Sequence, residues 1–229
     1  MRRLLISVGI VVCVVPTGVW VDSAQAENTL EGRVVVHVKS GEPKSDHANV
    51  VVFLDATERA HATTPRSPAP VTMASHDLRF VPEVLPVVAG TTVEFANQDT
   101  IYHNVFSKAK TKTFDLGFYE RGQSRSVVFN QTGLVKVYCD IHSRMVGYIL
   151  VLSNPYFAVT DAKGQFTIRE IPDGRYVVRA WQRFGPEAQQ TVTFAGAQAT
   201  PMTFELTEEK VSLEHTNKWD RAYEETYRR

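Results

Sequence analysis

Short runs of β-branched and aromatic residues, each followed by turn-forming residues, recur along the chain and restrict its fold more than any other feature. They include RVVVHV (33–38), NVVVFLD (49–55), TVEFAN (92–97), TGLVKVYC (132–139), YILVL (148–152) and RYVVRAW (175–181). Gly, Pro, Asn and Asp are common between the runs, as they are in hairpins and loops. No long stretch has a helical period. The pattern predicts an all-β protein.

Apolar and polar side chains alternate in the run at residues 132–139. Val135, Val137 and Cys139 fall on one face, and Lys136 and Tyr138 fall on the other. Successive side chains of a strand point to opposite faces of the sheet. The alternation therefore predicts that the Cys139 sulfur lies on the buried face, at the end of a strand.

The first 26 residues have the three parts of a secretory signal peptide. These are the basic MRR, the apolar LLISVGIVVCVVP and the small-residue site AQA. The apolar run is short for a membrane span, so we expect cleavage after Ala26, no stable membrane span, and a periplasmic or secreted protein. An uncleaved anchor is the alternative. Cleavage removes Cys13 and leaves Cys139 alone, which excludes an intramolecular disulfide.

Composition and length restrict the partners and the number of cores. The 25 Lys and Arg residues balance 25 Asp and Glu residues, and no basic block stands out, which argues against a nucleic-acid partner. A mature chain of about 200 residues can bury one large core or two small ones. The tail carries Trp219, Tyr223 and Tyr227 at steps of four, which predicts a short C-terminal helix with one aromatic face.

Three residues with metal-binding side chains follow one another at steps of three, namely Cys139, His142 and Met145. A thiolate, an imidazole and a thioether are the ligand types of a blue-copper site, which also needs a second histidine. Only His103 lies just beyond a predicted strand at the rim of the same sandwich. Each residue alone has a plainer interpretation, because a buried cysteine is usually a small apolar residue. Zinc favours more Cys and His ligands and gains little from a methionine.

Two segments together resemble a known family. FVPEVLPVVAGTTVEFANQDTIYHNVFS (80–107) and VYCDIHSRMVGYILV (137–151) are similar to cupredoxins, and the C-x-x-H-x-x-M loop is most similar to that of the amicyanins. The resemblance covers residues 71–152 and implies a Greek-key β-sandwich. It also implies one copper ion per chain, bound by His103, Cys139 and His142, with Met145 as a weak axial ligand. In the family, the residue matching Asn104 holds the ligand loop together.

The loop departs from the amicyanin pattern in its charge and in one proline position. Ser143 stands where a proline is common, and Asp140 and Arg144 add charge to the rim. These differences leave open whether an apolar docking patch surrounds His142, and they leave the reduction potential open.

A second resemblance concerns the outer segments. NPYFAVTDAKGQFTIREIPDGRYVVRAW (154–181) is similar to the carboxypeptidase regulatory-like, transthyretin-like sandwich. That sandwich normally opens with two strands of the kind found at residues 32–55, which here precede the copper block. We therefore expect the cupredoxin to be inserted in a second small β-sandwich. In the alternative, the early strands add to the cupredoxin sheet and the last block stands alone.

These assignments together give the expected domain organisation of the chain. It comprises a signal peptide (1–26), N-terminal strands (27–56), a linker (57–70), the cupredoxin domain (71–152), the regulatory-like sandwich (153–210) and a tail (211–229).

The resemblance implies a periplasmic electron carrier with a redox protein as its partner. The alternative is a copper-binding, delivery or adaptor protein without a redox partner, although four methionines are few for copper delivery. An enzyme fits less well, because no H-x-H occurs for further copper ions and no second cysteine remains to act with Cys139.

Overall fold

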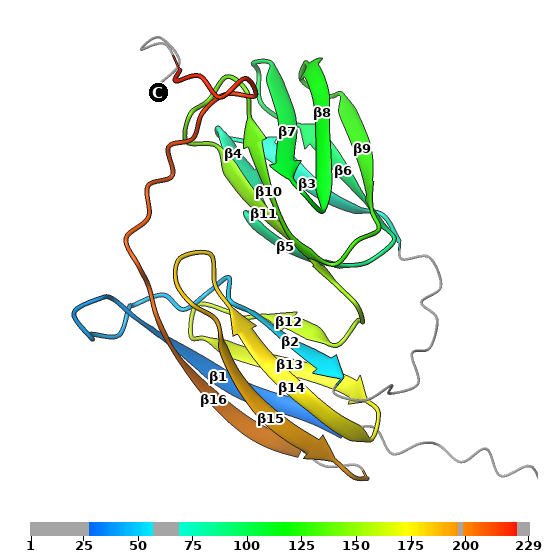
Figure 1. Ribbon diagram of the computed structural model, residues 1–229, viewed down its shortest axis with the longest axis vertical. Helices are drawn as coiled ribbons and strands as arrows, with labels where there is room; N and C mark the ends of the chain where they lie inside the picture. The colour runs from blue at the N-terminus through cyan, green and yellow to red at the C-terminus, as the bar shows by residue number, and fades with distance from the viewer. Residues whose placement is uncertain (1–27, 57–68, 197–198, 224–229) are drawn as a thin grey trace, which may run out of the picture.

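The computed structural model describes residues 28–56, 69–196 and 199–223 (Figure 1). Within these ranges the chain forms sixteen β-strands in four sheets and no helix, which confirms the all-β prediction. The expected signal peptide, most of the expected linker and Tyr227 lie outside the described residues. The described part of the chain contains no helix that could cross a membrane.

Strands from both ends of the chain build one sandwich, which we name the outer sandwich. Its sheets have the orders β13–β1–β16 and β12–β2–β14–β15. The strands are β1 (Asn28–His37), β2 (Val51–Ala56), β12 (Phe157–Val159), β13 (Gln165–Ile171), β14 (Gly174–Trp181), β15 (Ala188–Phe194) and β16 (Ala199–Thr207). β1 pairs antiparallel with β13 and parallel with β16. β2 pairs antiparallel with β12 and β14. Each sheet thus has one N-terminal strand between strands that follow residue 156.

The chain between β2 and β12 builds a second sandwich, which we name the central sandwich. Its sheets have the orders β5–β11–β10–β7–β8 and β4–β3–β6–β9. The strands are β3 (Val71–His76), β4 (Arg79–Val81), β5 (Val84–Val88), β6 (Thr91–Asn97), β7 (His103–Ala109), β8 (Lys112–Tyr119), β9 (Ser124–Phe129), β10 (Gly133–Cys139) and β11 (Val146–Leu152). Side chains of both sheets meet in one core, which includes Phe95, Val137 and Ile149 together with Cys139 and Met145.

β2 and β11 are continuous apolar runs because both faces of each strand are buried. In β2, Val52 and Leu54 face the core of the outer sandwich. The alternate residues Val51 and Phe53 belong to a third cluster that also contains Tyr148 of β11. The remaining face of β11 packs into the core of the central sandwich. The two sandwiches therefore meet through an apolar interface between β2 and β11.

The prediction of a C-terminal helix is wrong for the described residues 211–223, which form coil and turns. The Asn217 side-chain oxygen accepts hydrogen bonds from the backbone N–H groups of Trp219 and Arg221, both at 3.0 Å. Such a local side-chain bond competes with a helix. Trp219 is 63% exposed and Tyr223 only 8%, so these two aromatic residues do not share one buried face.

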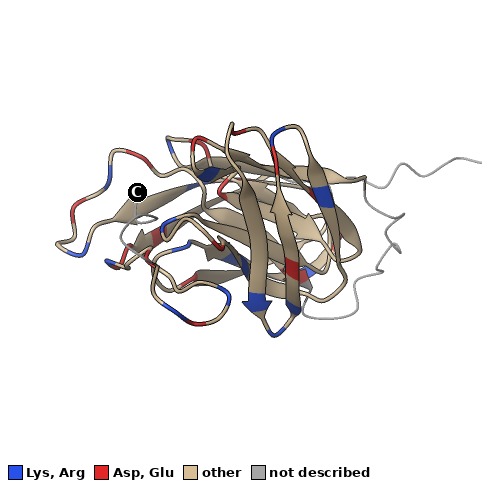
Figure 2. Ribbon diagram, turned by 90° about the horizontal axis from the view of Figure 1, so that it is seen from above, with Lys and Arg blue, Asp and Glu red and all other residues tan. Residues whose placement is uncertain are grey.

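Among the described residues, charged positions do not gather in one part of the view in Figure 2. Figure 2 looks onto the end of the molecule that is uppermost in Figure 1, and in this view basic and acidic positions are interspersed along the loops. This distribution agrees with the equal numbers of basic and acidic residues.

Candidate metal centre

The sheet topology brings the expected ligand residues to one end of the central sandwich. β7 begins at His103 and β10 ends at Cys139. The two strands are antiparallel neighbours in which Cys139 lies opposite Val105. The start of one strand therefore meets the end of the other, and His103 comes close to Cys139. Residues 139–145, which join β10 to β11 and which we name the metal loop, carry His142.

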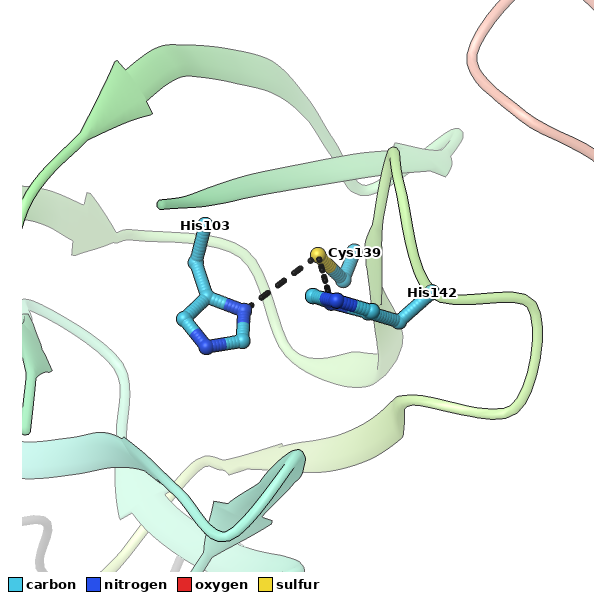
Figure 3. Close-up of side chains that lie close together, drawn as sticks. All are labelled: His103, Cys139 and His142. Atoms are coloured by element: carbon cyan, nitrogen blue, oxygen red, sulfur yellow. Dashed lines mark hydrogen bonds between the residues drawn. The ribbon is translucent and has the colours of Figure 1, made fainter. Parts of the chain in front are cut away.

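The donor atoms of three side chains converge on one point (Figure 3). Cys139 Sγ lies 3.6 Å from Nδ1 of His103 and 3.3 Å from Nδ1 of His142. The three donor atoms all lie within 4.8 Å of one another. Cys139 and His103 are fully buried, and His142 is half-buried. Two imidazoles and a thiol thus line one nearly closed site.

Asp99 orients His103, although no pattern in the sequence singled it out. Its Oδ2 accepts a hydrogen bond from Nε2 of His103 at 2.7 Å. The backbone N–H groups of Asp77 and Leu78 donate to the same carboxylate at 2.7 and 3.2 Å. A bond at Nε2 leaves Nδ1 free to bind a metal. The available signal was an aspartate in the turn after a strand, four residues before a histidine.

The electrostatics of the site keep the three donor side chains neutral at pH 7. Burial raises the pKa of the Cys139 thiol to about 11, although backbone N–H groups of Ile141, Asn104 and His142 oppose the rise. Burial, and then the proximity of His103, lowers the pKa of His142 to about 4. Burial also lowers the pKa of His103. Both imidazoles are therefore neutral at pH 7, and the thiol must lose its proton when a metal binds.

Met145 closes the metal loop from the buried side. It is 1% exposed and belongs to the same core cluster as Cys139. Its backbone N–H donates to the His142 carbonyl at 3.1 Å, and its own carbonyl accepts from the Cys139 N–H at 3.2 Å. These two bonds hold the ends of the loop together and place the Met145 backbone next to those of Cys139 and His142.

Asn104 lies beside the thiol, but its side chain points elsewhere. Its Nδ2 donates to Asp115 Oδ1 on β8 at 2.6 Å, and within the described residues its buried Oδ1 has no hydrogen-bond partner. The side chain therefore makes no hydrogen bond to the metal loop. The contact that Asn104 makes with Cys139 comes from its backbone N–H group, which favours the thiolate form.

A second group of potential donors lies on the surface. His76, Asp77 and Asp99 offer atoms within 4.8 Å of one another, but His76 and Asp77 are exposed. The Asp99 carboxylate is already occupied by His103 and by two backbone N–H groups. Within this group, Asp99 and the backbone N–H of Asp77 therefore serve to orient His103.

Comparison with known families identifies the class of the central sandwich. Residues 69–152 match the model of the copper binding proteins of the plastocyanin/azurin family. By this match the segment is similar to cupredoxins, which supports copper as its cofactor. The matched segment does not include the outer sandwich, whose likeness to the carboxypeptidase regulatory-like sandwich stays a prediction.

Solved structures similar to the chain include several copper proteins. A purple cupredoxin from Nitrosopumilus maritimus is 26% identical, with 37% of this chain and 100% of that chain covered and a TM-score of 0.33. Amicyanin from Paracoccus versutus is 23% identical, with 44% and 98% covered and a TM-score of 0.35. A copper-containing nitrite reductase from Thermus scotoductus is 28% identical, with a TM-score of 0.36; the match covers 41% of this chain but only 24% of that enzyme. No curated protein matches the chain.

The donor set of the site fits copper. A thiolate and a thioether are soft ligands that favour copper, and imidazole binds copper well. The described residues bring the thiol and both imidazoles together in a site closed off by the core.

Proposed function

We propose that this chain is an exported one-electron carrier with one copper ion per chain. His103 and His142 would bind the ion through Nδ1 and Cys139 through Sγ, with Met145 as the weak axial ligand. The observation that carries the proposal is the convergence of the three donor atoms, with Sγ at 3.3 and 3.6 Å from the two imidazole nitrogens. This convergence lies inside the segment that matches the plastocyanin/azurin family model.

The residues around the site support fast electron transfer. Copper, when bound, supplies a one-electron couple between its two oxidation states. Asp99 and the hydrogen bonds within the metal loop hold these side chains in place, so little rearrangement would accompany a change of charge. The buried cluster around Cys139 and Met145 excludes water from one side. The half-buried ring of His142 would be the route by which electrons leave.

The proposal also covers where the protein works and which kind of partner it has. The N-terminal sequence, with its basic, apolar and small-residue parts, favours export to the periplasm or beyond. A carrier needs a donor and an acceptor, so we propose a redox protein as the partner. We propose no enzymatic activity, because among the described residues the second donor group depends on Asp99, whose carboxylate already binds His103, and it therefore offers no independent second copper site.

Voltammetry of the copper-loaded protein tests the proposal against copper delivery. A carrier keeps its ion in both oxidation states, so we expect a reversible one-electron wave over repeated cycles. We also expect no loss of copper to a Cu(I) chelator at equal concentration. An irreversible wave, with the copper passing to the chelator on reduction, would instead identify a delivery protein.

A further inference from the structure

The C-terminal residues cross from the outer sandwich to the metal centre. We name residues 208–223, which follow β16, the strap. At its start, Glu208 N–H donates to the His37 carbonyl at 2.7 Å and Glu209 N–H donates to the Phe184 carbonyl at 3.1 Å. In Figure 1 the strap is the orange-to-red segment that leaves the outer sandwich and ends above the central sandwich. The strap is thus anchored on the sandwich that does not contain the metal centre.

The far half of the strap makes three hydrogen bonds to the metal loop. Tyr223 donates its hydroxyl to the Cys139 carbonyl at 2.7 Å. Lys218 donates its backbone N–H to Asp140 Oδ1 at 2.9 Å, and His215 donates its backbone N–H to the Ser143 carbonyl at 3.1 Å. The bonds reach three of the seven loop residues, one of them a proposed copper ligand.

A charged network extends this contact from the metal loop to β8 and the start of β7. Lys218 Nζ donates to Asp115 Oδ2 at 2.8 Å and lies 3.7 Å from Asp140 Oδ2. Asp115 in turn accepts the hydrogen bond from Asn104, whose backbone N–H faces Cys139. The strap therefore connects the metal loop with the start of β7.

The contact is a packed interface. Tyr223 is 8% exposed, and Asp140 and Ser143 are each 6% exposed. The ring of His215 lies between Tyr138 and Tyr223, with centroid distances of 4.6 and 5.4 Å. Because these loop residues are covered by the strap, the metal loop cannot open without breaking the strap contacts.

We propose that the strap is a working part of the copper centre and that Tyr223 is a positioning residue, which holds the metal loop closed and raises the reduction potential through the Cys139 carbonyl. This inference rests on the proposed function. It assigns to the outer sandwich the task of presenting the strap to the metal loop.

The direction of the effect on the potential follows from charge. Reduction adds one negative charge to the site. The hydroxyl of Tyr223 places the positive end of its dipole at the Cys139 carbonyl, close to the thiolate. A donor in that position stabilises the more negative, reduced state. Removal of the hydroxyl therefore lowers the reduction potential.

The same bond has a consequence in the metal-free protein. Removing one buried hydrogen bond should make opening of the metal loop about 5-fold more frequent, which corresponds to about 1 kcal/mol. Amide hydrogen exchange within residues 139–145 should then become about 5-fold faster.

The test compares Tyr223→Phe with Tyr176→Phe in the full mature chain. Tyr176 is a matched control in the outer sandwich, because it is also buried and also donates to a backbone carbonyl, that of Pro172 at 3.1 Å. We expect Tyr223→Phe to lower the reduction potential, shift the thiolate-to-copper absorption band and accelerate exchange at residues 139–145. We expect Tyr176→Phe to leave all three unchanged.

Two results would overturn the inference. One is an unchanged potential and band in Tyr223→Phe. The other is equal acceleration of loop exchange by both variants, which would reduce Tyr223 to a general contributor to stability. If the wild-type protein has no reversible copper wave, the proposed function fails instead, and the exchange measurement on the metal-free protein still decides whether the strap holds the loop.

Discussion

Asp99 determines which nitrogen of His103 faces the thiol. Its carboxylate binds the Nε2 side of the ring, and the N–H groups of Asp77 and Leu78 hold the carboxylate in turn. Although partial burial raises the pKa of Asp99, the hydrogen bonds from Leu78, His103 and Asp77 keep it below the ordinary value. Asp99 is therefore charged at pH 7 and adds negative charge beside a proposed copper ligand.

Replacing this charge while keeping the hydrogen bond should raise the reduction potential. Asp99→Asn retains an oxygen that can accept from Nε2 of His103, but it removes the charge that favours the oxidised site. We expect an increase on the order of 40 mV, equivalent to about 1 kcal/mol for a one-electron couple. Asp161→Asn is the control, since Asp161 also accepts two backbone N–H groups, in a turn of the outer sandwich. Equal potentials in the two variants would contradict this role for Asp99.

The metal-binding residues of the metal loop could be predicted from the sequence. The residues that hold the site in place could not. The alternation that ends at Cys139, together with the spacing to His142 and Met145, is a local pattern. His103 follows from its place after a predicted strand. Asp99 depends on N–H groups of another hairpin, and Tyr223 reaches Cys139 across 84 positions of the sequence. Contacts of this kind arise from the tertiary fold and leave no local pattern.

β2 illustrates at the element scale how one strand serves two cores. Its sequence VVFLDA has no polar face until Asp55, and its alternate residues enter different apolar clusters. The apolar run was enough to predict a strand. It could not predict which partners cover each face, because the covering residues come from strands spread between Leu30 and Leu206.

Neighbouring residues of β2 should therefore respond differently to truncation. Phe53→Ala opens a cavity in the interface between the sandwiches, and Leu54→Ala opens one in the core of the outer sandwich; each should cost about 2–5 kcal/mol. We expect calorimetry of Phe53→Ala to resolve two unfolding transitions, because the cavity in the interface weakens the contact that couples the two sandwiches. Leu54→Ala should lower the unfolding temperature without that separation. Two transitions in Leu54→Ala alone would contradict this assignment of the faces.

A charge pair joins β1 to β16 and should make stability depend on pH. His37 pairs with Glu205, and this hydrogen bond, followed by that to the Gly41 carbonyl, raises the pKa of His37. The stabilisation is complete below the ordinary histidine pKa of about 6.5 and is lost as the pH rises through the higher pKa of the folded state. Between about pH 6 and about pH 8, the wild-type melting temperature should fall more than that of His37→Gln. Parallel curves of melting temperature against pH for the two proteins would contradict this role of His37.

Across the whole molecule, the chain first forms two strands of the outer sandwich, then the central sandwich, and then the remaining strands of the outer sandwich. β1 and β2 lie between later strands in the two sheets of the outer sandwich, and the strap then crosses back to the metal loop. We propose from this topology that residues 71–152 form a domain inserted in the outer sandwich. The parallel pairing of β1 with β16 joins residues about 170 positions apart, so no local pattern could specify it.

Removal of residues 27–60 tests this arrangement. The deletion takes one inner strand from each sheet of the outer sandwich, whereas no residue of β1 or β2 belongs to the core around Cys139. We expect rapid proteolysis of residues 153–210 and retention of the thiolate-to-copper band. The reduction potential should move towards that of Tyr223→Phe, because the strap loses its anchor. A protease-resistant C-terminal sandwich of unchanged stability would contradict the insertion.

The most direct test of copper binding by Cys139 is a visible spectrum. It is recorded on residues 27–229 after addition of Cu(II), with Cys139→Ser measured alongside. A copper ion bound by the Cys139 thiolate should give an intense charge-transfer band, which the serine variant cannot produce. We expect this band in the wild-type protein at one copper ion per chain and its loss in Cys139→Ser. Copper binding without the band, or an equal spectrum in both proteins, would contradict it and make Cys139 a plain residue of the core.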